Sequence, residues 1–208
     1  MVTTMDSLRL SGTLTIPDGG VSSQTRATIL KQESDAIFPI DLTTLRVHDA
    51  YHTNLPGTAA TDDLALVGGT FGTAPPVVSA GDLKAAGATT RYARFQMVLP
   101  ECYDAGETVT LSVYAGIVTT IADVSCTLDV ECYKLDKITG IGSDLCATAA
   151  TTINSLVLAA IPFTITPSGL VAGDTFDVRI AIACNDAATV TAVTPTVSAI
   201  DLLADIKG

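Results

Sequence analysis

The sequence predicts an all-β protein: a jelly-roll-like antiparallel β-sandwich with an N-terminal arm that contains one strand. Three observations lead to this fold class. Residues that favour strands dominate the composition, apolar and polar residues alternate over many short segments, and one turn sequence occurs twice, about 67 residues apart. We therefore expect two parts, an arm over residues 1–35 and a β-sandwich domain over residues 36–208.

The repeated turn is the most informative feature of the chain. Each copy begins with a proline and ends with Ala-Gly, an acidic residue, a threonine and an apolar residue, and the copies span residues 100–109 and 167–176. Alternating apolar runs lie on both sides of each copy, with the period of a half-buried strand. The sequence therefore predicts two similar corners that each join two strands. The core-facing residues expected around them are Phe95, Met97, Leu99, Val109, Leu111, Val113 and Ala115, and Phe163, Ile165, Phe176, Val178, Ile180 and Ile182.

Three strands are expected before the first regular strand of the sandwich, at residues 8–16, 25–30 and 37–47. The first ends at Pro17-Asp18-Gly19-Gly20, which is a strong turn signal, and it looks set apart from the body of the protein. Pro39 indicates that the third strand lies at a sheet edge or contains a bulge, because proline cannot donate to a ladder of hydrogen bonds.

The middle of the chain predicts long loops followed by regular strands. Loops are expected at 48–60 and 72–90, on either side of a short apolar stretch at 64–71, and loops of this length are usually functional or form interfaces. A short helical turn or an irregular strand is expected at 142–154. The six regular strands are predicted at 91–99, 107–114, 124–134, 155–165, 174–183 and 191–203.

The composition limits the possible partners. Hydrophobic residues make up 48% of the chain and charged residues 16%, yet no apolar run approaches the ~18 residues of a membrane helix. We therefore expect no membrane partner and expect apolar surface to be buried between subunits. The net charge of −11 opposes binding to a phosphate backbone, so no nucleic-acid partner is expected. The N-terminus lacks the basic and apolar segments of a secretory signal, which indicates synthesis in a cytoplasm.

The five cysteines are predicted to be free thiols, mostly buried as small apolar residues. Their odd number and the absence of a C-x-x-C pair argue against a zinc knuckle and against a complete disulfide framework. Cys126 and Cys132 share a strand face with Leu128 and Val130, too far apart along the strand to bridge each other. The full set is Cys102, Cys126, Cys132, Cys146 and Cys184.

No catalytic, cofactor-binding or metal site is predicted. His48 and His52 have a spacing that would hold zinc on a helix, but no third ligand is apparent, so a polar loop or interface role is expected. The acidic residues at the two corners are candidate calcium ligands, with solvated turn carboxylates as the alternative. These are Glu101, Asp104 and Glu107 in the first corner, and Asp174 and Asp177 at the second.

The sequence also predicts no enzymatic activity. It has no G-x-S-x-G motif, and its glycine-rich segment at 68–72 lacks the lysine of a phosphate-binding loop. A pair of carboxylates for glycoside hydrolysis stays open as an alternative, although the chain has no Trp to stack on a sugar.

Several segments resemble small jelly-roll proteins of tailed bacteriophages, of the head decoration (cement) type. The resemblance covers about residues 40–208 and is carried by residues 43–47, NLPGTAATDDL at 54–64, LPECYDAGETV at 99–109 and LLADIKG at 202–208. It implies a homotrimer on the outer face of an icosahedral capsid, where each copy clamps neighbouring major capsid subunits. It supplies no site residues, because that role depends on surfaces.

We therefore expect a non-enzymatic virion structural protein whose partners are the major capsid protein and further copies of itself. The arm strand is a candidate for pairing with a sheet edge of a neighbour or of the capsid, through a segment containing Leu8, Leu10, Leu14 and Ile16. The alternative is that this strand completes its own sandwich. The second functional hypothesis is a receptor- or glycan-binding module of a tail fibre or appendage.

Overall fold

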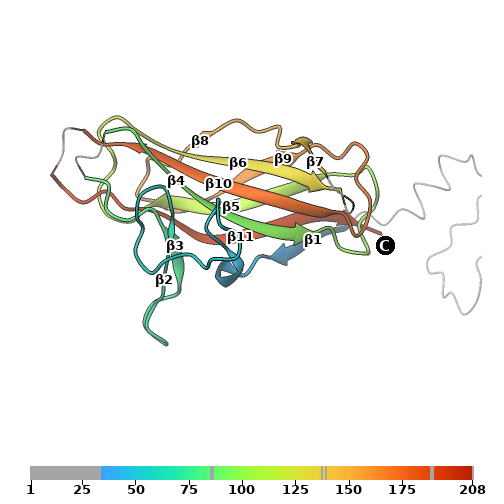
Figure 1. The fold of residues 1–208 in the computed structure, drawn as a ribbon, viewed down its shortest axis with the longest axis horizontal. Helices are drawn as coiled ribbons and strands as arrows, with labels where there is room; N and C mark the ends of the chain where they lie inside the picture. The colour runs from blue at the N-terminus through green and yellow to red at the C-terminus, as the bar shows by residue number, and fades with distance from the viewer. Residues whose placement is uncertain (1–33, 85–86, 137, 139, 188–189, 208) are drawn as a thin grey trace, which may run out of the picture.

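The structure is a computed structural model that describes residues 34–84, 87–136, 138, 140–187 and 190–207. These residues form two antiparallel β-sheets packed face to face, which confirms the predicted all-β, jelly-roll-like sandwich (Figure 1). The predicted strands at 8–16 and 25–30, with the interface candidates Leu8, Leu10, Leu14 and Ile16, lie outside the described residues. The arm and its boundary at residue 35 therefore stay predictions.

Each sheet is built around three long strands. Sheet A contains β1 (Ser34–Pro39), β2 (Ala65–Val67), β3 (Val77–Ser79), β5 (Val109–Ile117), β9 (Ala159–Ile165) and β11 (Pro195–Ile206). Sheet B contains β4 (Thr89–Val98), β6 (Ser125–Leu135), β7 (Ile141–Asp144), β8 (Thr151–Thr152) and β10 (Thr175–Asn185). The long strands alternate between the sheets along the chain, so the connections between them cross from one layer to the other.

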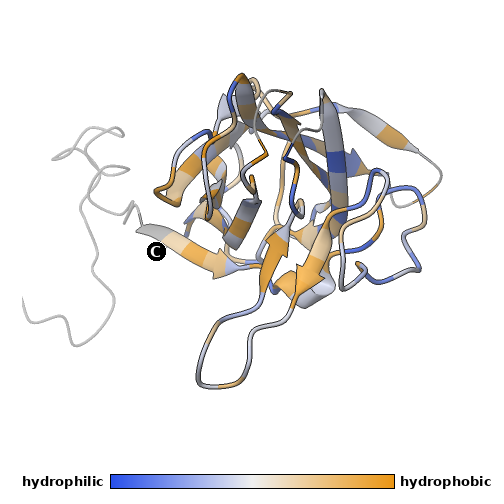
Figure 2. Cartoon of the chain, turned by 90° about the vertical axis from the view of Figure 1, so that its left-hand side faces the viewer, coloured by the Kyte–Doolittle hydropathy of each residue, from blue (hydrophilic) through white to orange (hydrophobic). Residues whose placement is uncertain are grey.

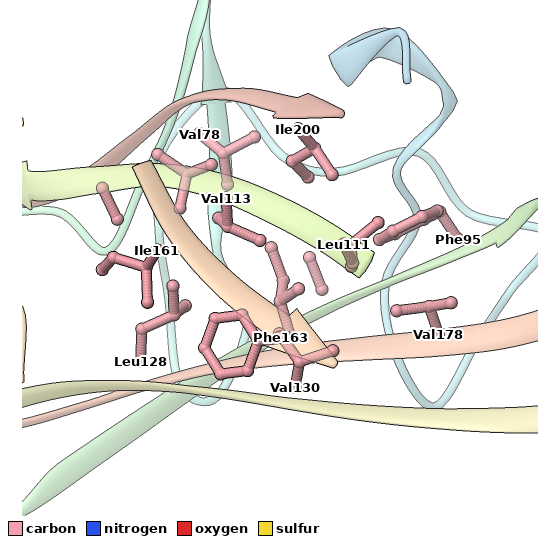
Figure 3. Close-up of a cluster of buried hydrophobic side chains, with 14 of the residues drawn as sticks. Val78, Phe95, Leu111, Val113, Leu128, Val130, Ile161, Phe163, Val178 and Ile200 are labelled. Carbon is pink, nitrogen blue, oxygen red and sulfur yellow. The ribbon is translucent and has the colours of Figure 1, made fainter. Parts of the chain in front are cut away.

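The core lies between the two sheets and follows the predicted alternation. In β10 the buried side chains include Phe176, Val178, Ile180 and Ile182, as the sequence predicts. The other core-facing residues predicted around the two corners are also buried. Figure 3 shows side chains of both sheets entering this one cluster. Among the described residues, no helix is long and apolar enough to cross a bilayer.

The two predicted corners are present and have matching backbone geometry. Tyr103 N donates to Pro100 O (2.9 Å), and Leu170 N donates to Pro167 O (3.1 Å) at the equivalent positions. Gly106 has φ of 86° and Gly173 has φ of 78°, a left-handed conformation that favours glycine. The sequence repeat therefore reports a structural repeat, at the β4–β5 and β9–β10 connections.

The two corners also hydrogen-bond to each other. Leu99 N, which follows β4, donates to Asp174 O (2.8 Å), and Gly173 N donates back to Leu99 O (3.0 Å). The first corner further joins the end of the chain, because Lys207 N donates to Cys102 O (2.7 Å). One end of the sandwich is thus closed by backbone contacts between segments far apart in sequence.

The structure corrects the predicted strand at residues 37–47. The segment forms the shorter strand β1, which pairs only with β11, and then a 3-10 turn over Leu42–Thr44. Asp41 caps this turn by accepting from Thr43 N at 2.8 Å, as short polar side chains do at helix starts. Pro39 ends β1, so its indication of an edge position is confirmed.

Other differences concern short elements. The predicted loop at 72–90 contains β3, which pairs with both β2 and β11 but is only three residues long. The ambiguous segment at 142–154 contributes β7 and β8 rather than a helical turn. The predicted strand at 155–165 begins only at Ala159. Three-residue strands carry too little alternation to be recognised in a sequence.

The cysteines are free, as predicted, and three of them are buried. Cys126 and Cys184 are neighbours across β6 and β10. The hydrogen bond with Cys184, together with burial, raises the pKa of the Cys126 thiol above its ordinary value. Burial likewise raises the pKa of Cys132. Cys102 departs from the expected burial because it lies exposed in the first corner.

We expect the Tyr103 hydroxyl to contribute measurably to the free energy of unfolding. The side chain is fully buried, and its hydroxyl donates to Glu107 O at 2.7 Å. We expect Tyr103→Phe to lower the free energy of unfolding by about 1–2 kcal/mol, since a buried hydrogen bond is lost without a change in shape. Urea unfolding measures this. Tyr114→Phe is the control, because Tyr114 is 37% exposed, and equal effects of the two substitutions would contradict the proposed role.

Candidate functional site

The outer face of sheet B carries charged and aromatic side chains. Apolar residues of β4, β6 and β10 point into the core, so the alternate residues point outward. Arg179 in the central strand β10 lies directly between Arg94 of β4 and Glu131 of β6. Two like charges are thus neighbours across β4 and β10, which is unfavourable unless each is compensated.

Two adjoining hollows make this face a groove. One has a volume of about 290 Å³ and the other about 200 Å³, and both are lined by Glu131 and Arg179. We call the combined hollow the sheet-B groove. Its wall includes Ile141 of β7 on one flank and His48, from the loop after the 3-10 turn, on another. Further lining residues are Thr90, Tyr92, Arg94, Thr127, Asp129, Tyr133, Ala150, Asp177, Ala181 and Ala183.

Each arginine in the groove has an acidic partner. Arg94 donates through Nε to Asp177 Oδ1 (2.6 Å) and through Nη2 to Asp177 Oδ2, a bidentate pair. These hydrogen bonds raise the pKa of Arg94 above its ordinary value. Arg179 pairs through Nη2 with Glu131 Oε2, a single contact. Asp177 is only 5% exposed, so the first pair is the more shielded from water.

Tyrosine rings flank the two arginines. The Arg179 guanidinium carbon lies 4.9 Å from the centre of the Tyr92 ring, and that of Arg94 lies 5.1 Å from the Tyr51 ring. Both separations are within the range of a cation–π interaction. Together with Tyr133, three of the five tyrosines lie at or beside the groove. The groove therefore offers planar rings, donors and acceptors to a polar ligand.

His48 is held beside two aspartates at one edge of the groove. The ring centroids of His48 and Tyr92 are 4.6 Å apart. His48 Nδ1 lies 3.6 Å from Asp63 Oδ1, and His48 Nε2 lies 3.6 Å from Asp62 Oδ2. A tight turn presents both carboxylates, with Asp63 N donating to Ala60 O (2.8 Å) and Thr61 at φ of 50°.

The structure places the candidate residues suggested by the sequence in separate surroundings. His48 contacts Asp62 and Asp63, whereas His52 is exposed in the loop that follows. Of the corner carboxylates proposed as calcium ligands, Asp174 accepts from Val171 N (2.8 Å) and pairs with Lys134 Nζ (2.6 Å). Asp177 pairs with Arg94. These two acids therefore face cationic side chains in separate places.

A second candidate surface lies at the end of the sandwich opposite the corners. The loop segments 118–124, 153–158, 186–187 and 190–194 meet there, because β5, β9 and β11 are in register at this end. Figure 2 views the molecule from this side. We call this surface the apolar end, and its exposed apolar side chains are Val118, Ile121, Val124, Leu156, Val157 and Val190. The only charged residues in these loops are Asp123 and Asp186.

Hydrogen bonds between the loops hold the apolar end in place. The Asn154 side chain accepts from Ala122 N (2.8 Å) and donates to Ala122 O (2.9 Å). Thr194 N donates to Thr119 Oγ1 (2.8 Å), and Val118 N donates to Thr194 O (3.2 Å). Several exposed apolar side chains on loops that meet at one end are typical of a site that contacts another molecule.

We expect the two ion pairs of the groove to contribute unequally to the free energy of unfolding. We expect Arg94→Ala to lower the free energy of unfolding by about 2–4 kcal/mol, because it leaves the buried Asp177 carboxylate uncompensated. Arg179→Ala should cost less than about 1 kcal/mol, since that pair is more exposed and screened by water. Urea unfolding of both variants tests this difference. An equal loss of unfolding free energy in both variants would show that the burial of Asp177 does not determine the cost of breaking its ion pair.

Comparison with known proteins finds distant similarities to solved structures. No family model matches the chain, and no curated protein matches it. A xylan-binding module, CBM15, aligns with 84% of this chain and all of its own length, at 13% identity and a TM-score of 0.42. The CBM22-1 xylan-binding domain of Paenibacillus barcinonensis Xyn10C aligns with 70% of this chain and 82% of its own, at 9% identity and a TM-score of 0.37. A chain from a structure of infectious bursal disease virus, Gx strain, aligns with 86% of this chain and 33% of its own, at 15% identity and a TM-score of 0.39. Similarities this low do not assign a function.

Proposed function

We propose that this protein is a non-enzymatic virion structural protein, a decoration protein that binds the outer face of an assembled phage head. The observation that carries the proposal is the apolar end. It presents six exposed apolar side chains on loops that hydrogen bonds hold in place. The resemblance of residues 40–208 to phage decoration proteins supports the same role.

The apolar end is suited to contact with another protein rather than with water. Leu156 is 58% exposed and Val157 is 70% exposed, and they are adjacent in the chain. The three loops contain no Lys or Arg, and of their two acidic residues only Asp123 is exposed, so little desolvation of charge opposes association. A protein that binds only the assembled shell stabilises that shell by mass action, and repetition over symmetric sites multiplies modest contacts.

The predicted arm belongs to the same proposal as a second contact. Leu8, Leu10, Leu14 and Ile16 would pair with a sheet edge of a neighbouring copy or of the major capsid protein. A homotrimer of the chain on the outer capsid surface accommodates both contacts. In that arrangement each copy uses the apolar end on the shell and the arm on its neighbour.

Co-sedimentation with assembled heads of the virus that encodes the chain tests this function. We expect the double variant Ile121→Asp/Val157→Asp to bind at least about tenfold more weakly than the natural protein, because binding would bury two carboxylates. Val171→Asp is the matched control, since Val171 is 51% exposed at the corner end. Deletion of residues 1–20 tests the arm separately.

Two outcomes would contradict the proposal. If the natural protein does not bind heads, or if heads without it keep their full resistance to heat and low salt, the decoration function is wrong. If the double variant binds as well as the Val171→Asp control, the apolar end is not the contact surface.

A glycan-binding module is the second candidate function, favoured by the sheet-B groove. Tyrosine rings beside paired arginine and carboxylate groups offer both stacking and hydrogen bonding to an oligosaccharide. A hydroxyl-rich ligand would lie along the groove, across β4, β10 and β6. This role uses a different surface from the apolar end, so one molecule has room for both.

Screening of the full chain against an array of oligosaccharides tests this candidate. For any glycan that binds, we expect Tyr92→Ala to weaken the affinity about tenfold through loss of stacking. Tyr114→Ala is the control, because Tyr114 lies on β5 in the other sheet. Absence of binding to all glycans, or equal binding by the two variants, would count against a glycan site in the groove.

A further inference from the structure

We propose that His48, Asp49 and Asp63 form a binding site for a divalent transition-metal ion. One ligand atom from each of these residues lies within 4.8 Å of the others. The site would join the loop after the 3-10 turn to the tight turn at residues 60–63. It is separate from the apolar end, and it stands independently of the decoration function.

Two of the donor atoms lack any other partner. His48 Nδ1 and Asp63 Oδ1 are shielded from solvent and make no hydrogen bond among the described residues. A polar atom left buried and unsatisfied is unfavourable, and native structures usually supply a partner, a water or an ion. A cation between these two atoms, which lie 3.6 Å apart, would satisfy both.

The spacing of the donors fits a metal ion. Ligand atoms about 2.1 Å from a tetrahedral zinc ion lie about 3.4 Å from one another. His48 Nδ1 and Asp63 Oδ1 are 3.6 Å apart, which needs almost no adjustment. The Asp49 side chain is exposed, so it has room to change rotamer toward the ion. Three protein ligands would leave a fourth position for water or for a ligand atom from outside.

The other nitrogen of His48 lies close to a second carboxylate. His48 Nε2 is 3.6 Å from Asp62 Oδ2, just beyond hydrogen-bond distance, so a small approach would let Nε2 donate to Asp62 and leave Nδ1 for the metal. Carboxylates in this position fix the tautomer and the orientation of a ligating imidazole. The Tyr92 ring, 4.6 Å away, further restricts the imidazole plane.

The donor set selects the class of metal. Imidazole nitrogen favours zinc and its neighbours in the first transition series, whereas calcium and magnesium take oxygen ligands almost exclusively. The alternative is a cluster without a metal ion, in which His48 only lies between Asp62 and Asp63. The two alternatives differ in whether the protein retains zinc.

Isothermal titration of the full, chelator-treated chain with zinc chloride tests the site, with the retained zinc counted after dialysis. We expect one zinc per chain and a rise in melting temperature when zinc is added. The double variant His48→Asn/Asp63→Asn should lose this binding. Asp62→Asn should weaken it by about 10–100-fold, the usual effect of removing a carboxylate that orients a ligand.

Two controls exclude other zinc ligands. His52→Asn removes the second histidine, which is exposed, and Cys102→Ser removes the exposed thiol. Both variants should bind zinc as the natural protein does. Failure of the natural protein to retain zinc overturns the proposal, and so does equal retention by the His48→Asn/Asp63→Asn variant. Circular dichroism establishes that each variant is folded.

Discussion

The rest of the structure depends on the two corners that carry the chain from one sheet to the other. Leu99 N donates to Asp174 O and Gly173 N donates to Leu99 O, so each corner fixes the position of the other. The strand residues that follow are thereby fixed in register. A shift of one residue would turn every core side chain of a strand outward. The corners therefore determine both the core and the surface that the groove occupies.

The two candidate surfaces differ in the charged side chains that they carry. On sheet B, Arg94 and Arg179 face each other across neighbouring strands, and each is compensated by an acidic partner on the same face. The three loops of the apolar end contain no Lys or Arg, and hydrogen bonds of the Asn154 amide and the Asp186 carboxylate join them. A polar ligand suits the first surface and a protein suits the second. Because one lies on a sheet face and the other at the end of the strands, occupation of one leaves the other accessible.

Local patterns made the framework predictable. Alternation in β10 gave its buried face from Phe176 to Cys184, and the repeated turn gave both corners, because each signal lies within about ten residues of chain. Short elements such as β3 were missed, since three residues carry no period. The outward positions of β4, β6 and β10 held mixed aromatic and charged residues, which was the available signal for the groove. Their assembly into one groove depends on strand order, which the sequence did not reveal.

The cluster around His48 was missed for the same reason, since Asp62 and Asp63 lie in a different loop that only the fold brings near. Arg46 exchanges hydrogen bonds with Arg94 of β4 (2.7 and 3.0 Å), and Leu64 N donates to Tyr92 O (2.9 Å). These contacts cover the free edge of β4, which would otherwise offer unpaired backbone groups to another chain. His48 follows the first covering segment, and Asp63 belongs to the second. The same two segments therefore protect the edge of β4 and assemble the cluster. A metal ion that joins His48 to Asp63 would also hold these two segments together along the edge of sheet B.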